Sequence, residues 1–460
     1  MTRTSLLGDE EPRVRSAAVV ETLAADGVEL VALTYVDNSG ITRVKGVPLG
    51  RLADAAVHGV GMSPVFDAFV VDDSITASPS AGGPIGDLRL VPDLDQAVAL
   101  AAQPGWAWAP VDRWRQSGER HPQCQRGFVR AMEARLASHG LTAKMAFELE
   151  WMLSIADDDG FEAATTGPAY GMTRVIQLSD YCVELARALE AEGIPVGQLH
   201  PEYAPGQFEV SVGACGPLAT ADRNVVARQT IRAVGERHGL RTSFSPSVVA
   251  GGVGNGMHLH LSLWDGDHNE AVGGTGPYGI TERFESFLAG ILDSLPALLA
   301  VTAPSVVSFL RLQPHRWAGP YRCWGVENRE AALRLISGQY SDTAGANAEV
   351  KAVDASASPY LVVGSVLAAG LSGIERALRL PADIDVDPGS LAIETLAARG
   401  IERLPASLPE AVEHFEHNDV LRDALGGDLH ETLVAVRRAE IELFEGQTDE
   451  EIVAATRWRH

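Results

Sequence analysis

The stretch GGVGNGMHLHLSLW at residues 251–264 has the alternation of polar and apolar residues that is typical of a half-buried β-strand. In such a strand His258, His260 and Ser262 share one face, and the leucines between them point to the other. The glycines at the start of the stretch let a ligand come close to the backbone. Their spacing does not match a dinucleotide-binding GxGxxG turn, and no GxxxxGK[ST] loop occurs in the chain. Nucleotide phosphates, if bound, would therefore be held by metal ions and arginines.

The stretch AFELEWML at residues 146–153 repeats this alternation with carboxylates. Glu148 and Glu150 fall on one face of the expected strand, and the apolar residues around them fall on the other. Two negative charges on one strand face repel each other unless a positive group lies between them. A metal ion is the simplest such group, so the stretch indicates a metal site on the polar face of a sheet.

The composition is typical of a soluble globular protein, with 46% hydrophobic and 21% charged residues in a chain of 460. A chain of this length exceeds one ordinary core, so we expect one large domain and a smaller one. The net charge of −24 argues against nucleic acid or an anionic membrane as a partner, because both need a basic face.

Two further features concern the cellular compartment. The four cysteines form no close pair and no CxxC unit, which fits a reducing environment. The N-terminal residues lack the apolar core of a signal peptide, and the most apolar later stretches are short or interrupted by proline. We therefore expect a cytoplasmic protein with no membrane partner.

The chain divides into three parts by its local patterns. Residues 1–14 form a polar tail, and residues 15–113 form a small α+β domain with one helix around 50–58. Residues 114–460 form the larger domain, whose sheet carries the chemistry on its polar face. Helices are expected in the larger domain at 124–140, 179–193, 219–239, 281–300, 360–378 and 408–446, and strands at 206–213, 257–264, 330–336 and 348–354.

Taken one at a time, the polar motifs have ordinary explanations. Two alternating carboxylates on a strand most often form a solvated face, and two histidines on a strand are often surface residues. The segment HPEYAPGQFEV places Glu202 and Glu209 on either side of a Pro-Gly turn, as a simple hairpin does. Arg311, Arg329 and Arg334 could each pair only with surface acids.

The combination of these motifs favours a functional explanation. Several carboxylates and an imidazole on strand faces suit oxygen-preferring ions such as Mg²⁺ or Mn²⁺ better than zinc. Arginines beside such a cluster suit phosphate and carboxylate ligands.

Six segments in this order carry a resemblance to a known family: ELE at 148–150, EYAPGQFE at 202–209, GNGMHLHLS at 254–262, Arg311, NREAALR at 328–334 and EVKAVDASASPYL at 349–361. Across nearly the whole chain they resemble the glutamine synthetase superfamily, in its type I branch. The resemblance implies an α+β fold, with a small N-terminal β-grasp domain before a large catalytic domain akin to guanido kinases. It also implies a homo-oligomer, a dodecamer of two stacked hexameric rings, with active sites between neighbouring subunits.

The resemblance also implies roles for individual residues. A first metal ion would be bound by Glu150, Glu202 and Glu209, and a second by Glu148, His258 and Glu349. Glutamate-binding positions are matched by Gly254 and Arg311. Nucleotide or phosphate contacts are matched by His260, Ser262, Arg329 and Arg334, and the two arginines are the catalytic candidates.

The implied cofactors are ATP and two or three Mg²⁺ or Mn²⁺ ions. In the reaction that the resemblance implies, the side-chain carboxylate of L-glutamate attacks the γ-phosphate of ATP. Metal ions and arginines neutralise the charge of that phosphate. An amine then opens the γ-glutamyl phosphate.

Three positions depart from the pattern of the ammonium-using members of the superfamily. Those members carry an Asp in the small domain that helps to hold ammonium, and here the matching position is Val60. They carry a Glu on a flap that closes the ammonium site, and here that position is Trp317. An Arg that binds glutamate is replaced by Lys351, which keeps the charge but loses bidentate geometry.

These departures favour a γ-glutamyl–amine ligase that acts on glutamate and a small organic amine. The alternatives are an ammonium-using glutamine synthetase with an unusual flap, and a non-catalytic ring-forming homologue, which should have lost metal ligands. A pocket that has exchanged two acids for Val60 and Trp317 fits a small monoamine, with ethanolamine favoured. A polyamine remains an alternative because its cations can contact the face of Trp317.

Overall fold

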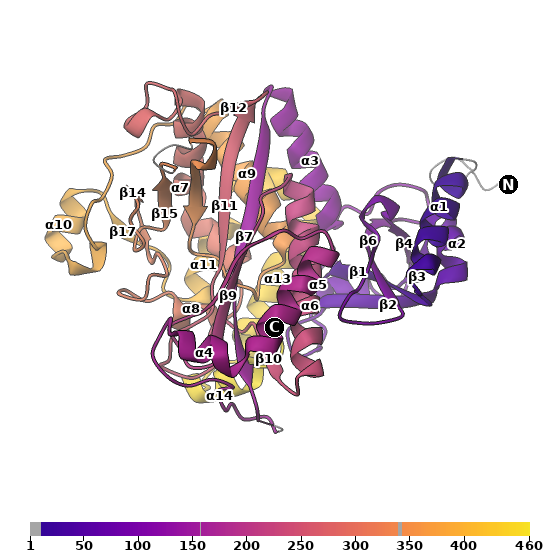
Figure 1. Ribbon diagram of the computed structural model, residues 1–460. Coiled ribbons are helices and arrows are strands. Elements are labelled where there is room, and N and C mark those ends of the chain that lie inside the picture. Colours follow the sequence, from indigo (N-terminus) through magenta and orange to yellow (C-terminus); the bar gives the residue numbers. More distant parts are fainter. Residues whose placement is uncertain (1–10, 157, 339–342) are drawn as a thin grey trace.

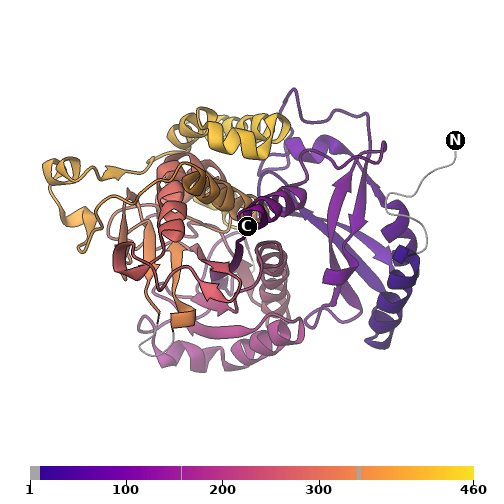
Figure 2. The same ribbon diagram turned by 90° about the horizontal axis from the view of Figure 1, so that it is seen from above.

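The computed structural model describes residues 11–156, 158–338 and 343–460. A small N-terminal sheet lies beside a larger body built on a second sheet (Figure 1). Seen from above, the N-terminal sheet lies to one side of the large body, with the indigo helices on its outer side (Figure 2). This arrangement confirms the expected α+β fold of a small domain followed by a large one.

The N-terminal sheet has the strand order β2-β1-β6-β4-β3, and β5 pairs with β6. Strands β1 and β6 run parallel, and the other neighbours run antiparallel. Its elements are α1 (Glu11–Ala25), β1 (Leu30–Val36), β2 (Thr42–Pro48), η1 (Leu49–Arg51), α2 (Leu52–His58), β3 (Val60–Met62), η2 (Pro64–Ala68), β4 (Leu88–Pro92), η3 (Leu94–Gln96), β5 (Val98–Ala99) and β6 (Trp106–Trp114). Leu33, Leu52 and Leu90 are buried together between the sheet and the helices.

Helix α1 corrects two sequence predictions. Residues 11–14 belong to this helix and not to a polar tail, and residues 1–10 lie outside the described part of the chain. The small domain also has a helix before its first strand, where the sequence suggested only the one around 50–58. The sequence did not indicate this helix because its apolar pattern is weak: among residues 16–25 only Ser16 and Leu23 are buried.

The large sheet has nine strands, in the order β14-β15-β16-β11-β7-β9-β8, with β10 on β7 and β12 on β11. All pairs are antiparallel except β14 with β15. The strands are β7 (Thr142–Ser154), β8 (Val196–Pro201), β9 (Gln207–Val212), β10 (Arg241–Ser243), β11 (Met257–Asp265), β12 (His268–Asn269), β14 (Trp324–Val326), β15 (Leu333–Ile336) and β16 (Asn347–Val350), and β13 (Tyr321–Arg322) pairs with β17 (Glu402–Arg403) away from this sheet.

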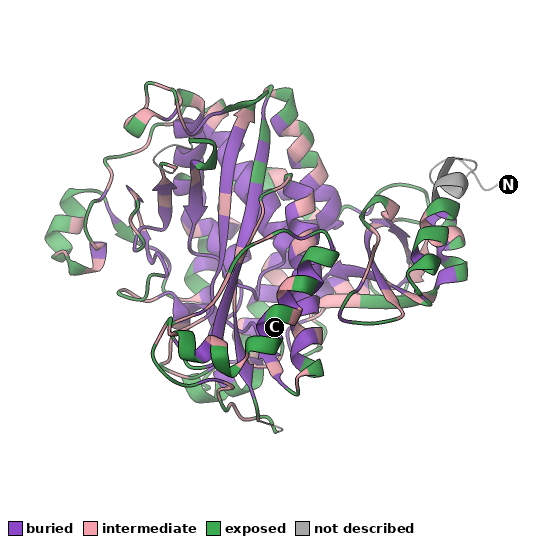
Figure 3. Cartoon of the chain, in the orientation of Figure 1, coloured by how far each residue is buried: buried purple, intermediate pink, exposed green. Residues whose placement is uncertain are grey.

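Helices cover the apolar face of the large sheet, and the buried residues lie between them (Figure 3). The helical elements are α3 (Gln125–Ser138), α4 (Met172–Gln177), α5 (Ser179–Ala191), α6 (Pro217–Arg237), η4 (Pro277–Gly279), α7 (Glu282–Thr302), α8 (Ser308–Arg311), η5 (Thr343–Gly345), α9 (Pro359–Glu375), η6 (Pro388–Ser390), α10 (Ile393–Ala398), α11 (Leu408–Glu416), α12 (Asp419–Leu425), α13 (Gly427–Leu443) and α14 (Asp449–Thr456). Helix α7 is long and apolar enough to cross a membrane, but 89% of its apolar window is buried inside the protein, as in a core helix.

Most helices of the large domain begin and end near the predicted residues. The long helix expected at 408–446 is wrong, because the structure has three helices there. The Asn418 side chain accepts a hydrogen bond from the Leu421 amide and so starts a new helix. Gly426 has a φ of 77°, which ends that helix. The strand expected at 330–336 begins only at Leu333, because the preceding residues form a turn.

Arginine side chains join the two bodies. The Arg126 guanidinium on α3 donates to the Asp222 carboxylate at 2.7 Å and to the Asp93 carboxylate of the small domain at 2.9 Å. Arg126 is buried, so these ion pairs hold its charge inside the protein. The predicted boundary at 113/114 lies at the last residues of β6.

Candidate active site

The polar face of the large sheet gathers the acidic side chains of neighbouring strands. On β7, Phe147, Leu149 and Trp151 are buried in the core, which leaves Glu148 and Glu150 on the opposite face. The strand order places β7 between β11 and β9, so residues from three strands meet around these two carboxylates.

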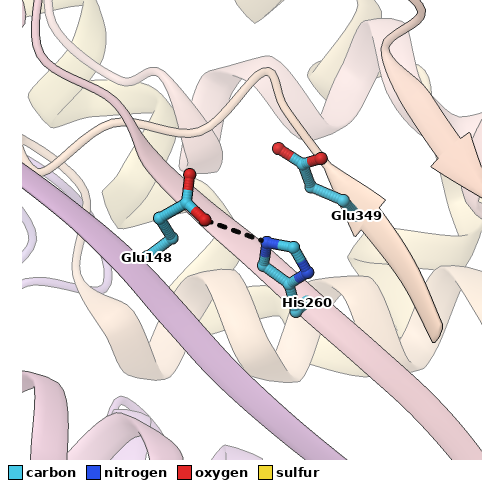
Figure 4. Close-up of side chains that lie close together, drawn as sticks. All are labelled: Glu148, His260 and Glu349. Atoms are coloured by element: carbon cyan, nitrogen blue, oxygen red, sulfur yellow. Dashed lines mark ion pairs between the residues drawn. The ribbon is translucent and has the colours of Figure 1, made fainter. Parts of the chain in front are cut away.

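The first cluster forms where β7, β11 and β16 lie side by side. His258 Nδ1 lies 3.3 Å from Glu148 Oε1 and 3.3 Å from Glu349 Oε1. His260 Nε2 lies 3.5 Å from Glu148 Oε2, the contact drawn in Figure 4. One ligand atom each from Glu148, His260 and Glu349 falls within 4.8 Å of the others. The first cluster therefore contains the residues proposed to bind the second metal ion, Glu148, His258 and Glu349, and His260 lies beside them.

The second cluster gathers residues from β7, from β9 and from the end of β8 and the turn that follows it. Glu150 and Glu209 are direct partners across β7 and β9. His200 Nε2 lies 3.1 Å from Glu209 Oε1, and His200 Nδ1 lies 3.6 Å from Glu202 Oε1. Ligand atoms of His200, Glu202 and Glu209 all fall within 4.8 Å of one another. The structure thus brings together the proposed ligands of the first metal ion.

Two residues of this cluster, His200 and Tyr170, were not among the site residues predicted from the sequence. His200 precedes Glu202 by two positions, and this spacing on a strand signals a shared face. The backbone amide of Tyr170 donates to the Glu202 carbonyl oxygen at 3.4 Å, and its ring lies 6.4 Å from that of His200. Tyr170 precedes α4 in a loop, so no periodic pattern could have pointed to it.

Protein donors partly satisfy Glu150. Its Oε2 accepts hydrogen bonds at 3.0 Å from the Gly256 amide and at 3.0 Å from the Gln207 side chain. Burial nevertheless raises the pKa of Glu150 to about 7, although the positive charge of Arg311 opposes this. Burial likewise raises the pKa of Glu209, to about 8. Carboxylates with raised pKa values gain free energy when a cation binds beside them.

Glu349 has the opposite shift. Burial alone would raise its pKa, but the positive charge of Lys351 and the nearby imidazoles lower it to about 2. Lys351 Nζ donates to Glu349 Oε1 at 2.9 Å, and both side chains are buried. Glu349 therefore stays ionised, as a metal ligand must.

The glutamate-binding candidates adjoin the first cluster. Arg311 donates through Nη2 to His258 Nε2 at 2.9 Å, and its Nη1 is buried without a hydrogen-bond partner among the described residues. Gly254 packs against this arginine, because a Cβ there would lie 2.9 Å from Arg311 Cβ and 2.2 Å from the Pro246 carbonyl oxygen. Only glycine fits this approach. An unpartnered guanidinium nitrogen beside a close backbone approach suits a carboxylate ligand.

The phosphate candidates differ in how firmly they are held. Arg334 donates to Glu349 at 3.2 Å and to Glu327 at 2.5 Å, so it is tied to the cluster. Arg329 is exposed, and its guanidinium carbon lies 6.0 Å from the centre of the Trp317 ring. Ser262 lies two residues beyond His260 on β11 and accepts a hydrogen bond from the Trp264 indole at 2.9 Å. Asn347, two residues before Glu349 on β16, places its Oδ1 2.9 Å from His260 Nδ1 and so orients that ring.

The two positions that depart from the ammonium-using pattern lie in different places. Trp317 is 55% exposed, has a φ of 52°, and donates its amide to Glu330 Oε1 at 2.9 Å. Val60 pairs with Leu90 at the edge of the N-terminal sheet. Strand β3, which carries Val60, belongs to the N-terminal sheet, apart from β7 and β11 of the large sheet that carry the carboxylates (Figure 1).

Comparisons with known proteins identify the family of the chain. Residues 122–454 match the model of the glutamine synthetase catalytic domain, and residues 14–118 match that of the glutamine synthetase N-terminal domain. The chain is 52% identical, over 97% of both chains, to the γ-glutamylpolyamine synthetase GlnA3 of Streptomyces coelicolor. It is 30% identical to the glutamine synthetase of Halobacterium salinarum, over 94% of each chain.

Solved structures give the same relationship. A crystal structure of a glutamine synthase homologue superposes with a TM-score of 0.84 at 33% identity, covering 94% of this chain and 99% of the other. The GmaS/ADP complex superposes with a TM-score of 0.81 at 28% identity, covering 94% and 97%.

Proposed function

The chain belongs to the glutamine synthetase family, and from this premise we propose that it joins an organic primary amine to the γ-carboxylate of L-glutamate through γ-glutamyl phosphate. Family members depend on ATP and a divalent metal, and this chain is a glutamate–amine ligase. One observation carries the proposal. Carboxylates and imidazoles gather in two groups on the large sheet. The segment that carries Trp317, which the resemblance aligns with an acid of the ammonium-using members, packs through Gly319 against Lys351.

The assignment of metal ligands rests on the two clusters. We assign one ion to Glu148, His258 and Glu349, and another to Glu150, Glu202 and Glu209, within a total of two or three Mg²⁺ or Mn²⁺ ions. Carboxylate oxygens in this number suit hard divalent ions. When bound, such ions neutralise the phosphate charge of ATP. The donor set fits them, because these buried carboxylates otherwise repel one another.

The other residues bind and orient the substrates. Gly254, Arg311 and Lys351 hold L-glutamate, with the free Nη1 of Arg311 available to a carboxylate. Arg334, held by Glu349 and Glu327, is placed to stabilise the charge on the transferred phosphoryl group, and we assign the same role to Arg329. His260 and Ser262 lie on the same strand face and contact the nucleotide.

The identity of the acceptor amine is a separate question within this proposal. Because Val60 and Trp317 stand where acids would bind ammonium, the sequence alone favoured ethanolamine as the acceptor. The 52% identity to an enzyme named for polyamines supports the alternative more strongly. We therefore place a polyamine first and keep ethanolamine as the comparison substrate.

Two alternatives lead to different expectations. An ammonium-using glutamine synthetase would need an acid on the flap, and Trp317 is not one. A non-catalytic homologue should have lost metal ligands, and each proposed ligand is present.

The assembly and the compartment are also part of the proposal. We propose a ring-forming homo-oligomer, a dodecamer, in which β3 of a neighbouring copy brings Val60 to the cluster. The acidic net charge and the free cysteines support a cytoplasmic enzyme with no nucleic-acid or membrane partner.

One assay tests the main proposal. Purified protein with ATP, Mg²⁺ and L-glutamate is supplied with ammonium, ethanolamine or a polyamine, and phosphate release and products are measured. We expect phosphate release to depend on an organic amine, with the γ-glutamylamide as product. Efficient synthesis of glutamine from ammonium, with no organic amine used better, would show the proposal to be wrong.

A further inference from the structure

A buried carboxylate lies directly beneath Trp317. Glu330 is only 6% exposed, and its Oε1 accepts the Trp317 amide hydrogen at 2.9 Å. Its Oε2 is buried and has no hydrogen-bond partner within the described residues. A carboxylate therefore lies directly against the backbone of Trp317, at a flap position that has no acid of its own.

The turn that carries Glu330 is held rigidly. Asn328 Oδ1 accepts the Glu330 amide hydrogen at 3.0 Å, and Asn328 Nδ2 donates at 3.0 Å to the carbonyl oxygens of both Ile384 and Val386. The direction of the Glu330 side chain is thus set by the fold before any ligand binds.

The flap, the segment around Trp317 and Gly319, packs closely against Ala332 and Lys351. A Cβ on Gly319 would lie 2.7 Å from Ala332 Cα and 3.2 Å from Lys351 Cβ, so this segment lies directly on the strand end that carries Lys351. Lys351 in turn pairs with the proposed metal ligand Glu349. Glu330 therefore borders the site where glutamate and its acceptor would meet.

Three cations surround Glu330: the guanidinium carbon of Arg329 lies 6.0 Å from the centre of the Trp317 ring, at the outer limit of a cation–π contact, and the other two are engaged elsewhere. Lys351 Nζ contacts Glu349 Oε1 at 2.9 Å, and His315 Nδ1 contacts the Asp387 carboxylate at 2.8 Å. Burial raises the pKa of Glu330, and Lys351 and His315 only partly oppose this. An unpaired carboxylate oxygen inside a protein is costly, and a structure that retains one needs an explanation. A cationic ligand is the partner that would relieve this cost.

We propose that Glu330 is the specificity-determining carboxylate that selects an acceptor with a second ammonium group, held between Trp317 and this side chain. The inference rests on the proposed amine ligase function and extends it to the substrate class. The indole face supplies a cation–π contact, and the buried carboxylate supplies the opposite charge. A monoamine lacks the second ammonium and gains nothing from Glu330.

A matched pair of acceptors tests this directly. 1,4-Diaminobutane and butylamine differ only in the terminal ammonium group. We expect the wild-type KM for the diamine to be lower by about tenfold or more, as a buried charge contact would produce. The Glu330→Gln variant should lose most of this difference, because glutamine still accepts the Trp317 amide hydrogen but carries no charge. Its KM for butylamine, glutamate and ATP should stay within about twofold.

Two further variants act as controls. Asp387→Asn removes a carboxylate that holds the same flap through His315 and should leave the diamine preference unchanged. Glu330→Asp keeps the charge and should retain part of the preference. If Glu330→Gln behaves as wild type while Glu330→Ala weakens all amines equally, Glu330 only holds the Trp317 backbone and the inference is wrong.

The remaining outcomes are also decisive. If the variants fail to fold, equal wild-type KM values for butylamine and the diamine overturn the inference by themselves. A wild-type enzyme that uses ammonium and no organic amine would overturn the proposed function as well. A wild-type enzyme that uses organic amines without regard to their second ammonium overturns only the role of Glu330.

Discussion

The strand-borne carboxylate cluster and the flap around Trp317 are built in different ways. In the cluster, Glu148, Glu150 and His258 stand on regular strands, and register alone brings them together. In the flap, His315 and Trp317 have positive φ values, and contacts to distant segments hold them. Strand periodicity allows the polar residues of the cluster to be predicted from the sequence. The positions of the loop residues depend on contacts with distant segments, so they are seen only in the structure.

Catalytic activity should depend strongly on each proposed metal ligand of the cluster. We expect Glu202→Ala to lower glutamate-dependent ATP turnover by about 10³-fold or more, since a metal ligand acts on transition-state charge. The fold should persist, because the relief of the repulsion between Glu202 and Glu150 offsets the loss of the hydrogen bond that Glu202 accepts from the Tyr203 amide. Phosphate-release kinetics and thermal unfolding check this. Normal turnover in a folded variant would remove Glu202 from the metal site.

Arg334 links the cluster to the loop before β15, so it tests whether the two regions act together. We expect Arg334→Ala to lower kcat by about 10²–10³-fold, as removal of a preorganised charge donor does. KM for the amine should change little if the flap is held independently. Steady-state kinetics with each substrate varied checks this. A change confined to the amine KM would instead place Arg334 in the acceptor pocket.

Trp317 tests the flap itself. We expect Trp317→Glu to lower kcat/KM for an organic amine by about tenfold, since each buried methylene contributes about 0.8 kcal/mol of apolar contact. Use of ammonium should rise less than this, because no second acid is restored at Val60. The ratio of glutamine to γ-glutamylamide measures both effects. Trp317→Phe is the matched control and should retain amine use.

The cluster also predicts a pH dependence of the stability of the fold. The folded-state pKa of Glu150, about 7, exceeds its ordinary value of 4.5, so the native state binds more protons between these values. Without divalent metal, stability should therefore fall as pH rises from about 4.5 to 7. Mg²⁺ should reduce this fall, because it binds the ionised form. Thermal unfolding with EDTA and with Mg²⁺ across this range checks the sign.

The smallest effect is expected at the outer edge of the flap. Arg316 donates to the carbonyl oxygens of Gly252 at 3.1 Å and Gly251 at 3.3 Å, but it is exposed. We expect Arg316→Ala to raise the amine KM by only about two- to fivefold, in line with an exposed contact of about 1 kcal/mol or less. A loss as large as that of Glu202→Ala would mean that the flap is as essential as the cluster.

The regular parts of the molecule could be predicted from the sequence. Alternation on β7 and β11 placed their polar residues on one face, and most helices of the large domain followed their apolar pattern. Helix α1 could not be predicted, because few of its residues are buried. The break within 408–446 depends on the cap at Asn418 and the turn at Gly426, which interrupt an otherwise continuous apolar pattern.

What the sequence by itself determined was the α+β class, the family resemblance and the chemical types of the site. These depend on local periodicity and on motifs that lie within single segments. Only the tertiary structure decided that Tyr170 lies beside His200, and that Glu330 lies buried under Trp317. The tertiary structure also separated Val60 from the cluster within one chain. The physical reason is that strand pairing and loop packing bring distant segments together through contacts that no local pattern encodes.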